Sequence, residues 1–545
     1  MTREFNLIDE PWIQVRSADN RTEMVSLKTC LLNCQNYLSL AGETVIQDAA
    51  VQMLLEAIVC RVLLEWRPDG QKDPVLSQEM AVDRWTEVYE AGKLPEKPFL
   101  SYLDSVHDSF YLIDEEKPFM QAVMAEAGTW YQAKKLSMSE SENKQRLFQG
   151  RSGKAKDTLT FAEAARFLLT LIAFDDSSVK PCKALKDKGD GSPGVGWAAK
   201  LGLIIVQGNN LFETLMLNCT LLKDGNEAWG NDKPYWEEDK VIRQRNHIRV
   251  PDNPVRILSI PSRRVLLKGE NGRIIGFNSV SGDYYEPENA SALQMTMWKK
   301  IEKKGKPVTY VPQLHSSAKA MWRDFASIAG DAKDDTVRTP GVIQWLNYLK
   351  SQDVLPKSFY VTLLAPFLEF DSKKCAVVDM SDYALRLDSS LLSEKGKVWL
   401  AVINDEIAKL EKAAVYTGYY YENVAAAKGQ SGDRLNEARS RGREAFFNAI
   451  DLPFTDWIAS VQPEAMDGYE EESQKMIKDW QSFVINTCRR LSDECQRNLP
   501  LRAMFGRAET GDKARRVKSA SEASQIYLST IYKLYSDEND RKETK

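Results

Sequence analysis

The chain has 545 residues, of which 43% are hydrophobic, and its formal net charge is −5. This length and apolar content are enough for two or three hydrophobic cores, which excludes a mainly disordered chain. The sequence has no apolar run of ~18 residues and no charged-then-apolar leader, so we expect a cytoplasmic protein without a membrane partner. The acidic balance argues against a uniformly basic nucleic-acid-binding domain, although a neutral body with local basic segments remains compatible with that role.

Two short apolar segments flank a proline at the start of the chain: Phe5-Asn6-Leu7-Ile8-Asp9-Glu10-Pro11-Trp12-Ile13-Gln14-Val15. This pattern predicts a strand, a turn set by Pro11, a buried Trp12 and a second strand. Residues 43–66 carry apolar side chains at helical spacing and are predicted to form a buried helix. Strand-like segments and loops are predicted up to residue 385, with helices near 161–174, 317–329 and 341–350, a strand over 211–218, and exposed loops over 181–196 and 223–242.

The pattern changes after Asp388, where four long amphipathic segments follow one another. They cover approximately residues 391–427, 431–460, 464–498 and 509–536, and glycines or prolines separate them. Long helices with short connections pack as antiparallel neighbours, so we predict a four-helix bundle. The predicted fold class is therefore α+β, with a large mixed α/β N-terminal body over 1–388 and a C-terminal bundle over 389–545.

Residues typical of catalytic and metal sites are sparse. The eight cysteines form no Cys-x-x-Cys pair, and the three histidines, His107, His247 and His315, share no motif. Residues 189–194 match G-x-G-x-x-G as a string, but Pro193 and the charged residues before it do not fit a dinucleotide fingerprint. Residues 150–154 have the wrong glycine spacing for a P-loop. We therefore predict no catalytic residue, no metal and no cofactor.

Positive charge is concentrated in several segments, each of which is either a nucleic-acid contact or an ordinary solvated surface. The first, residues 143–156, has five cations, no acid and an aromatic side chain suited to stacking on a base. Its candidate residues are Lys144, Arg146, Phe148, Arg151, Lys154 and Lys156. The second is a glycine-rich turn, whose backbone can approach another surface closely, formed by Gly194, Val195, Gly196 and Trp197.

The third segment, residues 243–273, is rich in arginines that suit phosphate or carboxylate forks. Its cations are Arg243, Arg245, Arg249, Arg256, Arg263, Arg264, Lys268 and Arg273. The fourth is a predicted hairpin over 370–378 with Lys373 and Lys374 at its tip. In the bundle, cations suited to a displaced single strand are Arg439, Arg441, Arg443, Arg502 and Arg507.

The opening string and the order of the two domains resemble the CasA family, the large subunit of the type I-E CRISPR surveillance complex Cascade. Residues Pro118-Phe119-Met120-Gln121 and the region 193–218 resemble this family as well. The resemblance implies a non-catalytic subunit that binds duplex DNA bearing a protospacer-adjacent motif (PAM) and helps open it for guide-RNA pairing. The implied partners are guide RNA, double-stranded target DNA, its displaced single strand, other Cascade subunits and a helicase-nuclease recruited in trans.

The resemblance also assigns roles to the basic segments. It implies that the 143–156 loop contacts guide RNA and DNA, that the glycine turn lies in the PAM minor groove, and that the hairpin tip wedges the duplex open. The chain departs from the family pattern at three places. Trp197 stands near a usual glycine, and Lys373 and Lys374 stand where amide side chains are usual. No lysine occurs near Val280, where the family has a PAM-reading lysine, so Lys268 or Arg273 is the candidate replacement.

Two other functions fit the same residues. One is an enzyme of unknown class that uses carboxylate chemistry, which a metal- or nucleotide-dependent activity of the isolated chain would favour. The other is a scaffold protein without direct DNA contact, which behaviour independent of salt and DNA would favour.

Overall fold

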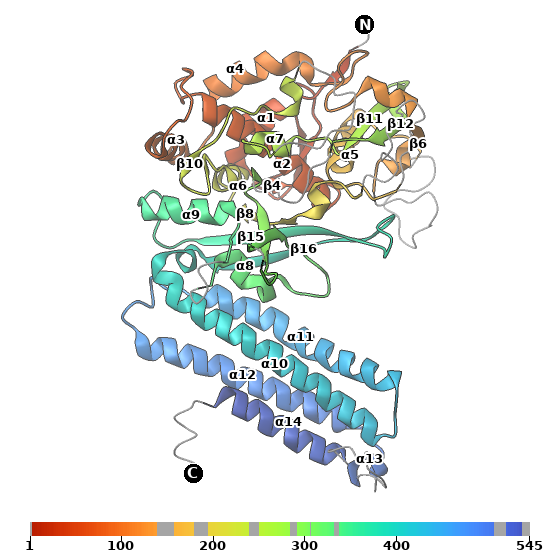
Figure 1. The fold of residues 1–545 in the computed structure, drawn as a ribbon. Helices are drawn as coiled ribbons and strands as arrows, with labels where there is room; N and C mark the ends of the chain where they lie inside the picture. The colour runs from red at the N-terminus through yellow and green to blue at the C-terminus, as the bar shows by residue number, and fades with distance from the viewer. Residues whose placement is uncertain are drawn as a thin grey trace. The chain divides into compact units, whose positions relative to one another are not determined.

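The computed structural model describes residues 3–138, 157–178, 194–238, 250–283, 292–305, 307–331, 337–505 and 519–536. The chain divides into two compact units. Unit 1 comprises residues 1–330, 336–357 and 361–385, and unit 2 comprises residues 331–335, 358–360 and 386–545. Unit 1 combines helices with small sheets, and unit 2 is helical, which confirms the predicted fold class (Figure 1).

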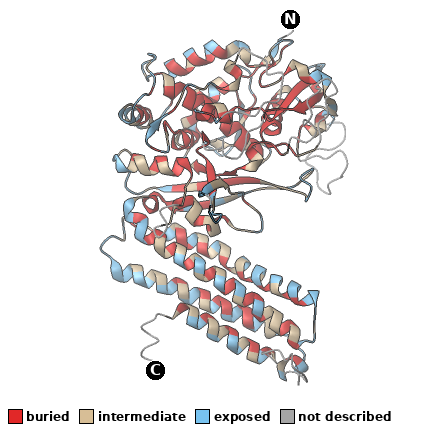
Figure 2. Ribbon diagram, viewed as in Figure 1, coloured by how far each residue is buried: buried red, intermediate tan, exposed pale blue. Residues whose placement is uncertain are grey.

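A long apolar helix, α2 (Val45–Glu65), forms the centre of unit 1. It is buried along nearly its whole length and packs against α5, α6 and α7, as the predicted buried helix requires (Figure 2). Thr44 caps its N-terminus by accepting a hydrogen bond from the Gln47 N–H. The other helices of this unit are α1 (Leu27–Leu32), α3 (Gln78–Glu90), α4 (Glu96–Val106), α5 (Phe161–Phe174), α6 (Leu211–Asn218), α7 (Pro254–Leu258), α8 (Phe325–Ala329) and α9 (Gly341–Ser351).

Within the described residues, the strands form six small sheets. The strands are β1 (Glu4–Asn6), β2 (Ile13–Ser17), β3 (Thr22–Val25), β4 (Tyr37–Leu40), β5 (Tyr111–Ile113), β6 (Thr129–Gln132), β7 (Gly202–Leu203), β8 (Ile205–Gln207), β9 (Leu222–Lys223), β10 (Glu227–Ala228), β11 (Arg263–Glu270), β12 (Arg273–Ser281), β13 (Thr296–Ile301), β14 (Thr309–Pro312), β15 (Tyr360–Phe370) and β16 (Val377–Asp388). Their orders are β1-β5, β10-β9, β3-β2-β4, β11-β12-β6, β14-β13-β7 and β16-β15-β8. Two of these sheets, β11-β12-β6 and β16-β15-β8, carry candidate site residues.

The N-terminal segment folds as its sequence predicts. Strands β1 and β2 flank the turn, and the Trp12 side chain is fully buried. Its indole N–H donates to the Leu7 carbonyl oxygen at 2.8 Å, so the one polar atom of the ring is satisfied inside the core.

Residues 211–218 are not the predicted strand but helix α6, so that prediction was wrong. The Asn210 side chain accepts the Glu213 N–H at 2.8 Å, and the Glu213 carboxylate in turn accepts the Asn209 N–H. This reciprocal capping starts a helix whose apolar side chains are buried nearly all round. The prediction of an exposed loop over 223–242 was also wrong for Trp229 and Trp236, which are buried.

In its described residues, unit 2 is a bundle of four long helices, α10 (Lys397–Ala427), α11 (Asp433–Ser460), α12 (Glu470–Gln496) and α14 (Ala520–Tyr535), with a short α13 (Leu501–Phe505). Helix α10 packs against α11 and α14, and α12 packs against the same two helices. Buried residues form stripes along the inner faces of these helices (Figure 2). Aromatic rings fill part of the core, where Trp457 stacks on Trp480 with ring centres 5.5 Å apart.

Candidate nucleic-acid interface

A hairpin formed by β15 and β16 carries the two tip lysines, as the sequence predicts (Figure 1). The Asp371 carboxylate closes the turn by accepting the N–H groups of Cys375 and Ala376 at 2.7 and 3.2 Å. Lys374 adopts a left-handed conformation with φ +57°. The side chains of Lys373 and Lys374 are exposed, so two ammonium groups stand at the end of a closed turn.

Residues 175–178, which follow α5, hold the main chain of this tip. Ser177 donates its N–H to the Lys374 carbonyl oxygen at 2.8 Å, and its hydroxyl lies 2.7 Å from the same oxygen and 3.1 Å from that of Lys373. The Ser178 hydroxyl reaches the Cys375 carbonyl oxygen at 3.3 Å. These bonds use only the carbonyl groups of the tip residues, so the tip is anchored while both lysine side chains stay available to solvent.

Arg263 ties the same segment to the glycine turn. Its Nε donates to the Asp175 carboxylate at 2.7 Å, and its Nη2 donates to the carbonyl oxygens of Asp176 and Gly194 at 2.7 and 2.6 Å. The side chains of Arg263 and Asp175 are 1% and 3% exposed, so this is a buried ion pair with hydrogen-bonded partners. The structure therefore joins two candidate segments that lie far apart in the sequence, the glycine turn and the hairpin tip.

The glycine turn itself is largely buried. Val195, Gly196 and Trp197 are buried, and the Trp197 indole N–H donates to the Ile260 carbonyl oxygen at 2.7 Å. A Cβ atom on Gly196 would lie 2.3 Å from the Ala173 carbonyl oxygen. The predicted exposed loop over 181–196 is therefore wrong for Val195 and Gly196, because this part of the turn packs against the end of α5. Gly194 is only half-buried and has φ +72°, so it is the residue of the turn that remains accessible.

Substitution of Gly196 by Ala is expected to lower the stability of the chain by about 3 kcal/mol, the upper end of the cost of overpacking. The added methyl group would meet backbone atoms of Ala173, which cannot move aside as a flexible side chain can. Gly194→Ala is the matched control, because it strains a left-handed φ but meets no atom closer than 3.7 Å. The measurement is thermal unfolding of both variants, and equal melting temperatures would contradict the packing described for Gly196.

The remaining described arginines of the 243–273 segment are not a surface patch. Arg264 is 1% exposed and pairs with Asp283 at 2.5 Å, and Arg256 pairs with Glu238. Burial raises the pKa of Asp283 to about 6, although the Arg264 charge opposes that rise. All three arginines therefore pair with carboxylates, which was one of the two predicted kinds of partner, whereas a surface position is wrong for the buried Arg263 and Arg264. Arg243, Arg245 and Arg249 lie outside the described residues.

Lys268 and Arg273, the two candidate replacements for the family's lysine, lie on β11 and β12. Lys268 Nζ is 2.8 Å from a Glu126 carboxylate that is 66% exposed, and such exposed pairs are weak enough to exchange for a phosphate. Arg273 donates to the Thr158 hydroxyl at 2.7 Å. Because Thr158 follows the predicted RNA-contacting loop, Arg273 holds the chain where that loop ends.

The 143–156 loop is itself outside the described residues, and with it Lys144, Arg146, Phe148, Arg151, Lys154 and Lys156. Arg507 of the bundle is outside them as well. Contacts of these seven residues with guide RNA or DNA therefore remain predictions.

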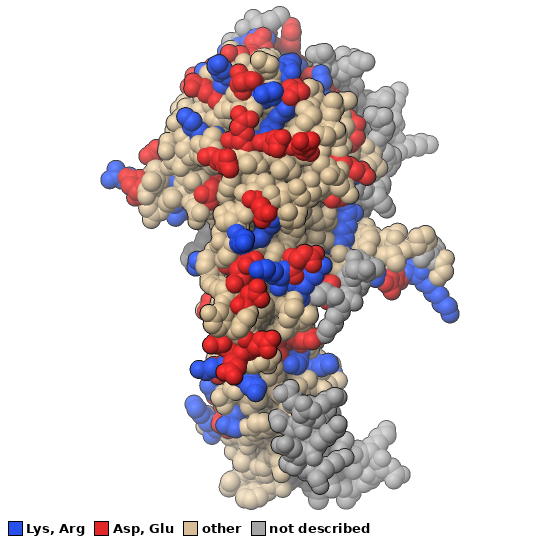
Figure 3. All heavy atoms as spheres, turned by 90° about the vertical axis from the view of Figure 1, so that its left-hand side faces the viewer, with Lys and Arg blue, Asp and Glu red and all other residues tan. Residues whose placement is uncertain are grey.

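In unit 2, the predicted basic face is only partly available. Arg441, Arg443 and Arg502 are exposed, whereas Arg439 donates its Nε to the Glu422 carboxylate at 2.8 Å and lies 4.7 Å over the Tyr419 ring. Acidic and basic side chains are interspersed on the face of the molecule that Figure 3 shows. Electrostatic attraction for a polyanion on that face must therefore come from small groups of lysines and arginines rather than from a uniform field.

The sequence analysis did not single out Ser177 or Asp175, and it predicted that Arg263 lies at the surface. The contact between Arg263 and Asp175 spans 88 positions, and the contact between Ser177 and Lys374 spans 197. The only local signal was the polar run Asp175-Asp176-Ser177-Ser178, which directly follows an apolar helix.

Within the described part of the chain, no helix is both long enough and apolar enough to span a lipid bilayer.

Comparison with known proteins identifies the family of this chain. The model of the family "CRISPR-associated protein Cse1" matches residues 6–491. The chain belongs to the Cse1 family. A curated Cse1 relative, "CRISPR-associated protein CasA/Cse1" of Thermus thermophilus, is 29% identical over 332 residues. That match spans 60% of this chain and 60% of the relative's length.

Solved Cse1 structures share the fold. Cse1 of Thermobifida fusca matches with a TM-score of 0.80 at 22% identity, covering 97% of this chain and 98% of that one. A chain of a "CRISPR RNA-guided surveillance complex" matches with a TM-score of 0.60 at 14% identity, covering 97% of this chain and all of that one. These likenesses confirm the predicted resemblance to the CasA family and place the mixed body and the bundle in one known fold.

Proposed function

We propose that this Cse1 family member is the large, non-catalytic subunit of a type I-E RNA-guided surveillance complex. In this role it binds duplex DNA at the PAM, helps open it for guide-RNA pairing and presents a surface to a helicase-nuclease recruited in trans. Family membership and the fold shared with a chain of a surveillance complex support the assembly. Protein reading a short motif while base pairing reads the rest is a division of labour known for another RNA-guided system.

The single observation that carries the DNA-binding part is the anchored hairpin tip with its two exposed lysines. A wedge must resist displacement, and the bonds from Ser177 and Ser178 to the tip carbonyl groups supply that resistance. It must also meet phosphates, and Lys373 and Lys374 provide two unburied ammonium groups. We propose that these lysines contact the DNA backbone beside the PAM while their aliphatic stems pack against the opened base pair.

Hydrogen bonds connect the accessible end of the glycine turn to this wedge. Gly194 has no side chain, is half-buried and is joined to the tip anchor through Arg263. A narrow minor groove admits a bare backbone more readily than a side chain. We propose that Gly194 approaches the groove, while Val195, Gly196 and Trp197 support it from the core.

Reconstitution tests this function against the enzyme and the scaffold. The purified chain, added to a guide-RNA complex that lacks it, is expected to restore preference for a matched duplex with a PAM over the same duplex without one. Alone, it is expected to leave DNA, RNA and ATP intact. Cleavage that tracks the chain through purification and disappears with a point mutation would favour the enzyme. Assembly without any gain in PAM preference would favour the scaffold.

A further inference from the structure

Helix α2 carries a line of polar side chains along an otherwise apolar surface. Asp48, Gln52, Glu56 and Cys60 follow one another at four-residue spacing, which places them on one face of the helix. Gln52, Glu56 and Cys60 are 4%, 1% and 2% exposed, so this face is buried. Polar groups on a core helix are costly unless they have partners, which indicates a specific role for the line.

The inner end of this line meets a second cysteine from another element. Cys219, the C-cap residue of α6, is fully buried and its sulfur lies 3.5 Å from that of Cys60. The Cys60 sulfur lies 3.6 Å from Glu56 Oε1. One carboxylate oxygen and two sulfur atoms thus lie within 4.8 Å of one another, and among the described residues no other three acidic, cysteine or histidine side chains form such a group.

The two separations from the Cys60 sulfur are close to the edges of a coordination tetrahedron. With Zn–S of about 2.3 Å and Zn–O of about 2.0 Å, two sulfur ligands lie about 3.8 Å apart and a sulfur and an oxygen about 3.5 Å apart. The observed 3.5 and 3.6 Å differ from those values by a few tenths of an ångström or less. We propose that Glu56, Cys60 and Cys219 bind a thiophilic divalent cation of the Zn²⁺ class.

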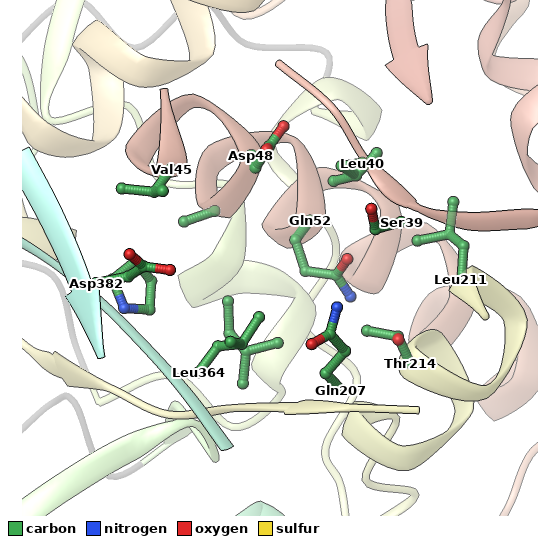
Figure 4. A pocket seen from close by; sticks show the side chains of 13 residues that line it. Ser39, Leu40, Val45, Asp48, Gln52, Gln207, Leu211, Thr214, Leu364 and Asp382 are labelled. Atoms are coloured by element: carbon green, nitrogen blue, oxygen red, sulfur yellow. The ribbon is translucent and has the colours of Figure 1, made fainter. Parts of the chain in front are cut away.

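A neighbouring side chain orients the carboxylate of this cluster. Gln52 Nε2 lies 3.4 Å from Glu56 Oε2, so the oxygen that does not face Cys60 has an orienting partner. Gln52 also lines a cavity of about 160 Å³, where its side chain points toward Gln207 (Figure 4). The cavity reaches Gln52, which lies four residues from Glu56 on the same face of α2, whereas the three proposed ligands do not line it.

A bound ion would join α2 to the end of α6 and so stabilise unit 1. Each thiol would lose its proton to solvent as the metal–sulfur bond forms. This site is independent of the proposed DNA interface, since none of its ligands belongs to the hairpin tip or the glycine turn. The competing structure is a network of thiol hydrogen bonds without metal, in which Cys60 donates to Glu56.

Cobalt titration distinguishes the two. Chelator-treated full-length protein is expected to bind one Co²⁺ per chain with thiolate-to-cobalt charge-transfer absorption, and Zn²⁺ is expected to displace it and raise the melting temperature. Cys60→Ser and Cys219→Ser should abolish the charge-transfer band, whereas Cys30→Ser, which changes another fully buried cysteine, should keep it. Glu56→Gln preserves the shape of the side chain and should weaken Co²⁺ binding at least about tenfold.

Absence of the band in the parent protein, or its persistence in a Cys60→Ser, Cys219→Ser double variant, would overturn the site. If either single variant fails to fold, the Glu56→Gln titration decides alone, and unchanged affinity there rejects the proposal. A Cys60–Cys219 disulfide found by mass spectrometry of protein purified under reducing conditions would reject it too.

Discussion

Duplex opening beside the PAM is expected to fall at least about tenfold when Lys373 and Lys374 are both replaced by Ala, since one charge-assisted hydrogen bond contributes about 1.5–3 kcal/mol. Both side chains are exposed at the hairpin tip, and the tip is held through main-chain carbonyl groups that the substitutions leave unchanged. The wedge therefore keeps its position but no longer has ammonium groups to bind phosphate. The salt dependence of target binding should fall by about one unit of slope for each lysine that binds a phosphate in the parent.

Permanganate footprinting of the assembled complex on a PAM-bearing target measures this opening. Lys303→Ala with Lys304→Ala is the matched control, because these adjacent exposed lysines occupy the turn between β13 and β14 and change the net charge equally. The control should open the duplex as the parent does. If both double variants open DNA equally well, the lysines of the hairpin tip do not act at the point of strand separation.

Replacement of Arg263 by Ala is expected to cost about 3–5 kcal/mol, because it leaves the buried Asp175 charge without its partner. It also removes the donors to the Asp176 and Gly194 carbonyl groups, so the segment that anchors the hairpin tip loses its attachment. Arg263→Met retains much of the side-chain volume. A similar loss of stability in that variant would therefore show that the lost ion pair, rather than lost packing, is responsible.

Thermal unfolding and hydrogen exchange of residues 175–178 and 194–197 measure these effects. A double-mutant cycle with Asp175→Asn isolates the interaction free energy of the Arg263–Asp175 pair, and the effects of the two single substitutions on stability should be strongly non-additive. Arg263→Ala protein that melts with the parent and keeps its exchange protection would show that the buried pair does not hold the two segments together. Such a result would also remove the structural link between the glycine turn and the wedge.

Features set by neighbouring residues were predictable from the sequence. The four bundle helices follow from apolar periodicity and from breaks at glycine and proline, and the hairpin follows from two apolar strands around Asp371 and two lysines. The same local reasoning predicted a strand over residues 211–218, because a short apolar run is ambiguous. The Asn210 and Glu213 pair, a helix-start signal, would have corrected it.

Features set by distant residues were not predictable. Nothing near Arg263 shows that Asp175 neutralises it, and nothing near Gly196 shows that Ala173 lies against it. Both residues were therefore predicted to lie at the surface, while the structure makes them supports for Gly194 and the hairpin tip. Cys60 and Cys219 escaped notice for the same reason, because they lie 159 positions apart and match no spacing motif.

Crosslinking from the hairpin tip tests the central claim most directly. Cys375 is exposed beside the two lysines, so a photoreactive maleimide attached there reports what the tip contacts in the assembled complex, with Cys375→Ser protein as the background. We expect crosslinks to the DNA bases and phosphates next to the PAM, present with a matched PAM-bearing duplex and absent when the PAM is changed. Crosslinks to other subunits alone, or DNA crosslinks equal to those of the Cys375→Ser background, would contradict a role for this chain in opening target DNA.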